Sequence, residues 1–164
     1  MICRFFATVL VLALPGIAQA RDALGVFDGW GAFRDPAVPR CYAISEPVGR
    51  TQPGAGGWRA FASVGTWPRK GVRGQFHARL SRARAEGTEV VLTIGDSRFL
   101  LVAGNADIWA SDRQTDAAII AAMRSATSMT IGAIAGNGLR FTDRYALRGA
   151  ATAMDAAALG CGNN

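Results

Sequence analysis

The chain has 164 residues, half of them hydrophobic, with 18 basic side chains against 12 acidic ones and a sequence pI of about 10.2. Its single histidine excludes zinc sites built on histidine pairs, and its three cysteines are too far apart in sequence for a C-x-x-C metal or redox motif. Neither a Walker loop nor a dinucleotide-binding glycine motif occurs, and the acidic residues form no tight cluster. We therefore expect no metal site and no cofactor.

The first twenty residues are typical of a cleavable export signal. Arg4 precedes an apolar stretch from Phe5 to Leu14, and Ala18-Gln19-Ala20 matches a small-residue cleavage site. This stretch is too short to span a bilayer, which takes about 20 residues, and no later segment resembles it. We expect a signal peptide over residues 1–20, export to the periplasm or cell envelope, no transmembrane span, and a single domain over residues 21–164. An uncleaved N-terminal anchor is the alternative.

Cleavage would discard Cys3 and leave Cys41 and Cys161 as a pair, together with 17 basic against 12 acidic residues. In an oxidising compartment an isolated pair of cysteines usually forms a disulfide; two free, buried thiols are the alternative. Because the bond would close nearly the whole domain, the chain-entropy model gives a stabilisation on the order of 4–5 kcal/mol. The modest basic excess is compatible with an anionic envelope polymer as partner but does not require one.

Alternation of apolar and polar residues predicts a mainly β fold. In Val72–Leu80, Phe76 falls on the predicted core face, whereas His77 falls on the solvent face between Gln75 and Arg79. Many short strands separated by glycine-rich turns indicate an antiparallel β-sandwich. Besides Val72–Leu80, we expect strands at Arg40–Ser45, Trp58–Val64, Thr88–Ile94, Arg98–Val102, Asp107–Ala110, Met129–Ile134 and Leu139–Leu147, and a loop at Arg50–Gly57.

Two helices are expected in the second half of the chain. Asp112–Ser125 carries an apolar stripe at helical spacing, with Asp112 or Thr115 available as N-cap. Ala150–Leu159 is expected to form a C-terminal helix that ends at Gly160. The second cysteine follows directly, so a disulfide would join this helix to the first predicted core strand.

No catalytic constellation emerges from the sequence. Gly95-Asp96-Ser97 resembles the nucleophile block of one group of esterases, but it lies centrally and His77 precedes it, so a hairpin turn is the simpler interpretation. A serine nucleophile needs a histidine base. His77 is predicted on a solvated face among arginines, whose charges depress its pKa, and no carboxylate is evident to orient it. We therefore expect no catalytic residue and no enzymatic activity.

Basic and aromatic residues gather in one part of the chain. Because Phe76 falls on the core face, these residues do not share one surface, and a solvated charged strand is favoured over a nucleic-acid site. The tryptophans are interpreted as packing residues, with a ligand groove as the alternative. The basic residues are Arg69, Lys70, Arg73, Arg79, Arg82 and Arg84, and the tryptophans are Trp30, Trp58, Trp67 and Trp109.

An ordered set of motifs along the chain resembles the invasion-associated locus B family of bacterial envelope proteins. The set covers nearly the whole chain after the export segment. The loop Ala135-Gly136-Asn137-Gly138 departs from it, because family members often carry a Ser-Ala-Arg-Gly-Thr-like run there. The motifs are Trp30-Gly31-Ala32-Phe33, Arg40 to Pro47, Asp107-Ile108-Trp109-Ala110, Ala121-Ala122-Met123-Arg124 and Asp143 to Gly149, followed by Ala153 and Cys161.

The resemblance implies a periplasmic or envelope-associated β-sandwich with no agreed enzymatic activity, and it carries over no catalytic residue. It implies structural roles for the Cys41–Cys161 bond, for Trp30 and Trp109 in packing, and for Gly149 at a strand-to-helix corner. We expect an exported, non-enzymatic interaction protein whose partner is an envelope or host protein, and no nucleic acid. The alternatives are a secreted hydrolase with an unrecognised site and a basic module that binds an anionic envelope polymer.

Overall fold

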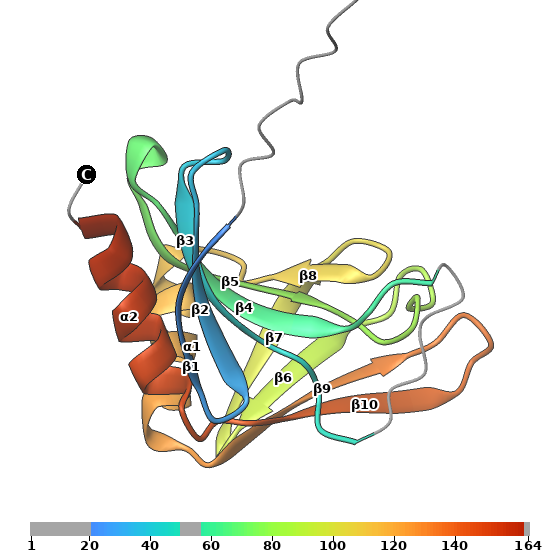
Figure 1. Ribbon diagram of the computed structural model, residues 1–164. Helices are drawn as coiled ribbons and strands as arrows, with labels where there is room; N and C mark the ends of the chain where they lie inside the picture. The colour runs from blue at the N-terminus through green and yellow to red at the C-terminus, as the bar shows by residue number, and fades with distance from the viewer. Residues whose placement is uncertain (1–20, 50–56, 163–164) are drawn as a thin grey trace, which may run out of the picture.

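The computed structural model of the chain describes residues 21–49 and 57–162 (Figure 1). The predicted export segment 1–20 and most of the predicted loop Arg50–Gly57 lie outside the described residues. The described chain forms the strands β1 (Asp22–Phe27), β2 (Trp30–Asp35), β3 (Arg40–Ser45), β4 (Phe61–Trp67), β5 (Val72–Arg79), β6 (Val90–Ile94), β7 (Ser97–Ala103), β8 (Asp107–Trp109), β9 (Ser128–Ile134) and β10 (Arg140–Ala146). The helices are α1 (Arg113–Ser125), α2 (Ala150–Gly162) and the short 3-10 helix η1 (Pro68–Lys70).

The strands pair antiparallel in the order β1-β2-β3-β4-β5-β8-β7-β6-β9-β10. This sheet bends over one core, so that buried residues of β5 such as Phe76 belong to the same cluster as Leu92 of β6 and Ile131 of β9. At one end the indole N–H of Trp30 donates to the carbonyl of Ala146, 2.8 Å away, which links β2 to β10. The predicted antiparallel β fold with a helix in the second half and a C-terminal helix is confirmed.

The alternation that predicted the strands has the expected physical basis. In β6, Val90, Leu92 and Ile94 are buried and the residues between them are half-buried. Gly95 and Asp96 form the two-residue turn into β7, and Gly95 has φ +55°, a backbone conformation that glycine adopts without steric cost. The interpretation of Gly95-Asp96-Ser97 as a hairpin turn is therefore confirmed.

Helix α1 begins where its N-cap predicts, because the carboxylate of Asp112 accepts a 2.7 Å hydrogen bond from the amide of Thr115. Helix α2 does not end at Gly160 as expected but continues to Gly162. A β-carbon at position 160 would lie 2.5 Å from a methyl group of Leu24 in β1. Glycine at this position therefore lets the helix pack closely on Leu24, and it does not terminate the helix.

Two strands were not predicted, and the bounds of a third differ from the expected ones. Strand β1 contains a bulge between Ala23 and Gly25, which breaks period two. Strand β2 has half-buried residues on its second face, so it shows no alternation of apolar and polar residues. The expected strand Trp58–Val64 begins only at Phe61 and continues to Trp67. The indole of Trp58 instead donates to the carbonyl of Leu80, 2.9 Å away.

The corner that leads into α2 depends on Gly149. This residue has φ +83°, and a β-carbon on it would overlap the carbonyl oxygen of Phe27 at the end of β1. The structure therefore places Gly149 at a strand-to-helix corner, as the family resemblance implies.

Candidate interaction surface on the outer face of the sheet

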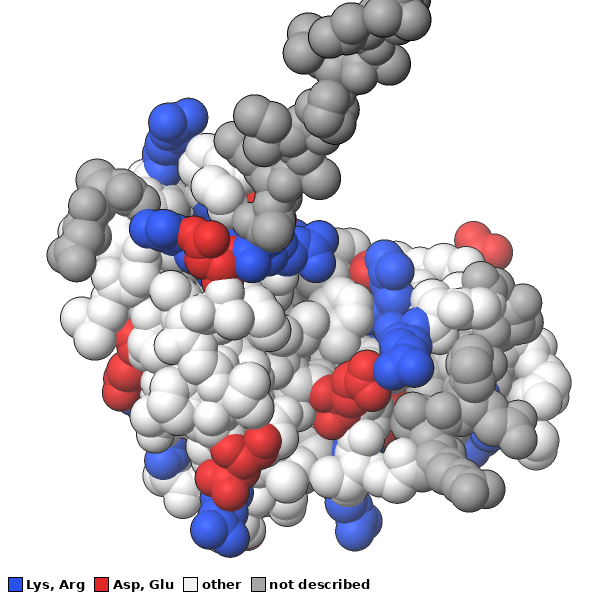
Figure 2. Space-filling model, viewed as in Figure 1, with Lys and Arg blue, Asp and Glu red and all other residues white. Residues whose placement is uncertain are grey.

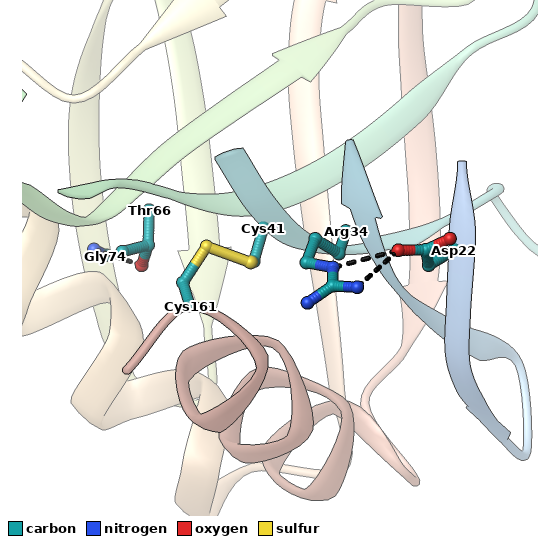
Figure 3. Close-up of a disulfide and its surroundings, with 6 residues drawn as sticks. All are labelled: Asp22, Arg34, Cys41, Thr66, Gly74 and Cys161. Atoms are coloured by element: carbon teal, nitrogen blue, oxygen red, sulfur yellow. Dashed lines mark hydrogen bonds and ion pairs between the residues drawn. A yellow bond between two sulfur atoms is a disulfide. The ribbon is translucent and has the colours of Figure 1, made fainter. Parts of the chain in front are cut away.

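The predicted disulfide is present and fixes the C-terminal helix to the sheet. Cys41 of β3 and Cys161 near the end of α2 are bonded, with their Cα atoms 5.8 Å apart. Figure 3 shows the bond between the Arg34–Asp22 ion pair on one side and the contact of Thr66 with Gly74 on the other. Helix α2 also contacts β1, β2 and β4, so it covers the inner side of the first four strands (Figure 1).

The opposite side of these strands, which we call the outer face, carries a row of residues in register across seven strands. Consecutive members of the row are paired neighbours in the antiparallel ladder. Apolar or aromatic side chains predominate in it, and its two ends, Val26 and Val102, are exposed by 72% and 54%. This cross-strand row consists of Val26, Gly31, Ile44, Ser63, His77, Trp109 and Val102.

Aromatic rings lie flat on the outer face over glycines. A β-carbon on Gly31 would lie 2.6 Å from the ring of Phe33, and one on Gly65 would lie 2.7 Å from the indole of Trp67. Phe33 stacks on Tyr42 with ring centroids 5.7 Å apart, and the guanidinium of Arg40 lies 4.8 Å from the Tyr42 ring centroid. The glycines make room for the rings, which together form a broad apolar surface.

A shallow groove runs along the cross-strand row at its β1 end. Its lining includes Val26, Ile44 and Phe61, together with Phe33, whose ring lies over Gly31. The groove has a volume of about 590 Å³ and is open to solvent.

His77 lies at the centre of a second aromatic group on this face, which corrects the prediction of a solvated histidine. Its ring stacks on Trp109 with centroids 5.1 Å apart and meets Phe61 edge-on at 5.2 Å. Its Nε2 lies 2.9 Å from the Oδ1 of Asp107, and only 25% of its side chain is exposed. The carboxylate that the sequence did not reveal comes from β8, which pairs directly with β5.

The charges around His77 are neutralised within the group. Arg79 donates from Nε and Nη2 to the two carboxylate oxygens of Asp107, each at 2.9 Å. Burial lowers the pKa of His77, an effect that the hydrogen bond and charge of Asp107 oppose and the charge of Arg79 reinforces. Burial by itself raises the pKa of Asp107, but the hydrogen bonds from Arg79 and His77 hold it below its usual range.

His77 and Asp107 have the arrangement of a base and its orienting carboxylate, but the neighbouring serine is not placed as a nucleophile. Ser63 is the cross-strand partner of His77, yet its hydroxyl donates to the backbone carbonyl of His77 at 3.1 Å. A serine nucleophile must instead donate to the imidazole ring. The structure therefore brings together two members of a triad and leaves the third engaged elsewhere.

Ion pairs lie at both margins of the outer face. Near one end of the strands Arg40 approaches the buried carboxylate of Asp35 at 3.5 Å. Near the other end Arg59 pairs with Glu46 at 3.1 Å, beside the Arg79–Asp107 pair. Figure 2 shows uncharged surface over α2 and the neighbouring strands β1 and β2, with Lys and Arg side chains and Asp and Glu side chains at its edges.

The predicted basic concentration is divided among separate surroundings. Arg73 lies on the helix side, in a cavity of about 480 Å³ that Arg124 and Met154 also line. The guanidinium of Arg82 lies 6.0 Å from the ring centroid of Phe141, and that of Arg84 donates to four backbone carbonyls in nearby turns. Phe76 is fully buried, as expected. These residues do not form one surface for a polyanion.

The four tryptophans fall into two groups. Trp30 is fully buried, and Trp58 is bonded to the backbone at Leu80, so both pack as the sequence suggests. Trp67 and Trp109 lie half-buried on the outer face. Successive side chains of a strand point to opposite faces, so Asp107 and Trp109 share the face opposite to the buried Ile108. The alternation in Asp107-Ile108-Trp109 is the sequence signal that could have predicted this.

Within residues 21–49 and 57–162, no group of three or more His, Cys, Asp or Glu side chains is placed to hold a metal ion. No helix in the described part of the chain has the length and apolar character needed to cross a membrane.

Comparison with known proteins identifies the fold. No protein-family model matches the sequence, and no curated protein sequence matches it. The crystal structure of invasion associated protein B from Bartonella henselae is similar, with a TM-score of 0.59 and 13% sequence identity over 87% of this chain and 99% of that one. The chain thus has the fold of invasion associated protein B, which confirms at the level of the fold the resemblance that its motifs indicate.

Proposed function

We propose that the chain is an exported protein of the periplasm or cell envelope that works by binding a protein partner and not by catalysis. The export motif of residues 1–20, the Cys41–Cys161 disulfide and the fold of invasion associated protein B support this location.

The outer face is the observation that carries this function. Monomeric proteins rarely expose broad apolar patches without a binding role. Protein interfaces are enriched in Trp, Tyr, Phe and Arg at their centre and surrounded by a polar rim. The outer face has this composition, with Phe33, Phe61 and Trp109 inside it and the Glu46–Arg59 pair at its margin.

A secreted hydrolase is the second candidate, and His77 with Asp107 is the observation that favours it. Their 2.9 Å contact supplies a base and an orienter, but the hydroxyl of Ser63 donates to a backbone carbonyl and not to the imidazole. A basic module for anionic polymers is less favoured, because Asp35, Glu46 and Asp107 lie beside the arginines of the outer face.

The test compares three variants of the exported protein in the cell that produces it. Val26→Arg places a charge on the outer face, Leu159→Arg places one on an equally exposed apolar residue of α2, and His77→Gln removes the base. We expect the phenotype of the intact protein and its cross-linking to a protein partner to be lost in Val26→Arg and kept in Leu159→Arg. In His77→Gln, whose altered side chain lies within the outer face, we expect binding and phenotype to weaken together. A folded His77→Gln protein that loses the phenotype while still binding its partner would support the hydrolase instead.

A further inference from the structure

We propose that the cavity on the helix side of the sheet binds an amphiphile with one anionic head and a single apolar chain, of the fatty-acid class. The cavity lies where the hairpin of β4 and β5, with η1 between the two strands, meets the helices α1 and α2, and its volume is about 480 Å³. This site is separate from the outer face. The inference therefore goes beyond the proposed function and does not rest on it.

A β-bulge in β5 turns Arg73 toward the cavity. The ladder between β4 and β5 shifts register between Gly65 and Trp67, so that two residues of β5, Arg73 and Gly74, lie opposite the single residue Thr66 of β4. The amide of Gly74 donates to the hydroxyl of Thr66, 3.4 Å away, beside the disulfide in Figure 3. Regular alternation would direct Arg73 to the outer face. The bulge instead places it among the residues that line the cavity.

Glycine in the bulge lets α1 approach the strand. Gly74 has φ +68°, a conformation that favours glycine, and a β-carbon on it would lie 2.7 Å from the Cδ1 of Ile120 in α1. Ile120 and Arg73 both line the cavity. The bulge thus brings a cationic side chain and an apolar helix side chain to the same site.

The cavity has an apolar interior and a cation at its mouth. Val64, Met154 and Ala157 line it and are buried, whereas Arg73 is exposed. Ligand pockets are typically apolar, with a few polar groups that fix the orientation of the ligand. An apolar chain can therefore lie against the buried side chains while an anionic head stays at the guanidinium.

Arg73 has no carboxylate partner of its own. All twelve acidic residues of the chain lie in the described ranges, and none of them forms an ion pair with Arg73 there. The second cation at the cavity, Arg124, is already paired, because its Nη2 lies 2.6 Å from the Oδ1 of Asp155. A guanidinium binds carboxylate and phosphate groups through paired N–H donors. Arg73 is therefore the residue that binds the head.

The volume of the cavity favours one chain. An apolar cavity of about 150 Å³ accommodates benzene. A cavity about three times as large has room for an unbranched chain of about twelve carbons with its head group. The two longer chains of a phospholipid do not fit in this space. Dodecanoate is therefore a suitable probe.

Isothermal titration calorimetry of the exported protein, freed of bound lipid on a hydrophobic resin, tests the proposal. We expect one dodecanoate site per chain. Octanoate should bind about tenfold more weakly or worse, because it buries fewer methylene groups. Dodecyltrimethylammonium, which has the same apolar chain and the opposite charge, should also bind about tenfold more weakly or worse.

Two pairs of variants locate the site. Arg73→Gln should weaken dodecanoate binding about tenfold, whereas Arg98→Gln, which changes another exposed arginine outside the ion pairs of the described chain, should not. Ala158→Trp places a large side chain at an exposed position of the cavity wall and should block binding. Leu159→Trp changes the next residue of α2, which does not line the cavity, and should leave binding intact. Near-ultraviolet circular dichroism checks the fold of each variant.

The results separate this proposal from the proposed function. An unchanged protein that does not bind dodecanoate overturns the site, as does binding that persists at full strength in Arg73→Gln. Equally tight binding of dodecyltrimethylammonium overturns the anionic head. If Ala158→Trp does not fold, the comparison of ligands and the Arg73→Gln variant still decide. Val26→Arg alters only the outer face and should bind dodecanoate like the unchanged protein, so either proposal can fail while the other stands.

Discussion

His77 and Asp107 lie thirty residues apart in sequence, yet Nε2 of the histidine is 2.9 Å from a carboxylate oxygen of the aspartate. Burial lowers the pKa of His77 below its ordinary value of 6.5, so the folded state favours the neutral ring. A group whose pKa is lowered on folding stabilises the protein above its unfolded pKa and loses that contribution as the pH falls through its folded pKa. His77 should therefore make the protein less stable below about pH 6.5.

This pH dependence is measured best as a difference between two proteins. The unfolding free energy from urea titration should fall more between pH 7.5 and pH 5.5 in the unchanged protein than in His77→Gln, which cannot be protonated. The other groups that titrate in the folded state are present in both proteins and cancel in the comparison. An equal fall in the two proteins would show that Asp107 compensates fully for the burial of the ring.

The disulfide between Cys41 and Cys161 should be a main source of stability. It closes a loop with a sequence separation of 120 residues, and loss of a native disulfide from a small exported domain typically costs about 2–5 kcal/mol. The double variant Cys41→Ala, Cys161→Ala should unfold at a lower temperature than the oxidised protein. Reduction of the unchanged protein should lower its melting temperature and raise its mass by two hydrogens. Two thiols that alkylate readily in the native exported protein would contradict the bond.

Asp116 should anchor α1 to the sheet. Its carboxylate accepts a 2.7 Å hydrogen bond from the amide of Phe76 in β5. Asp116→Ala leaves that amide without its partner, at a cost of about 1–3 kcal/mol, whereas Asp116→Asn keeps an acceptor oxygen and should cost less. Urea denaturation measures both. If the asparagine variant is as unstable as the alanine variant, an interaction other than acceptance of the Phe76 N–H is responsible.

Gly149 should tolerate no side chain, unlike a second glycine with nearly the same backbone conformation. Gly149 has φ +83° and Gly138 has φ +81°, but only the β-carbon at 149 would overlap another residue, at the carbonyl of Phe27. Gly138→Ala should cost about 1–2 kcal/mol for the left-handed conformation alone. Gly149→Ala should cost clearly more, as thermal unfolding of the two variants will show. Equal costs would mean that the corner moves to accommodate the methyl group.

Export should remove residues 1–20 and leave Arg21 as the first residue of the recovered protein. The small residues of Ala18-Gln19-Ala20 are the expected cleavage site. Intact-mass measurement of protein from the periplasmic fraction decides this directly. A periplasmic product that retains Phe5–Leu14 would instead support an uncleaved anchor.

Local patterns in the sequence were sufficient to predict most of the strands and both α-helices. Alternation predicted β5 and β6 because each has one face in the core, and helical spacing with Asp112 or Thr115 as N-cap predicted α1. The strands β1 and β2 were missed because a bulge and two half-buried faces hide period two. The disulfide was predicted from the isolated pair of cysteines, since such a pair usually forms a bond in an oxidising compartment.

The candidate site was decided by tertiary structure. Sequence placed His77 correctly on the outward side of its strand, but whether an outward side chain is solvated depends on which strands lie next to it. The chain runs β5-β6-β7-β8, and yet β8 pairs with β5, so Asp107 and Trp109 arrive beside His77 from a strand that is not its neighbour in sequence. Alternation of apolar and polar residues shows which side chains of a single strand point to the same side of the sheet. The pairing order, set by burial of the core as a whole, determines which faces join into one surface.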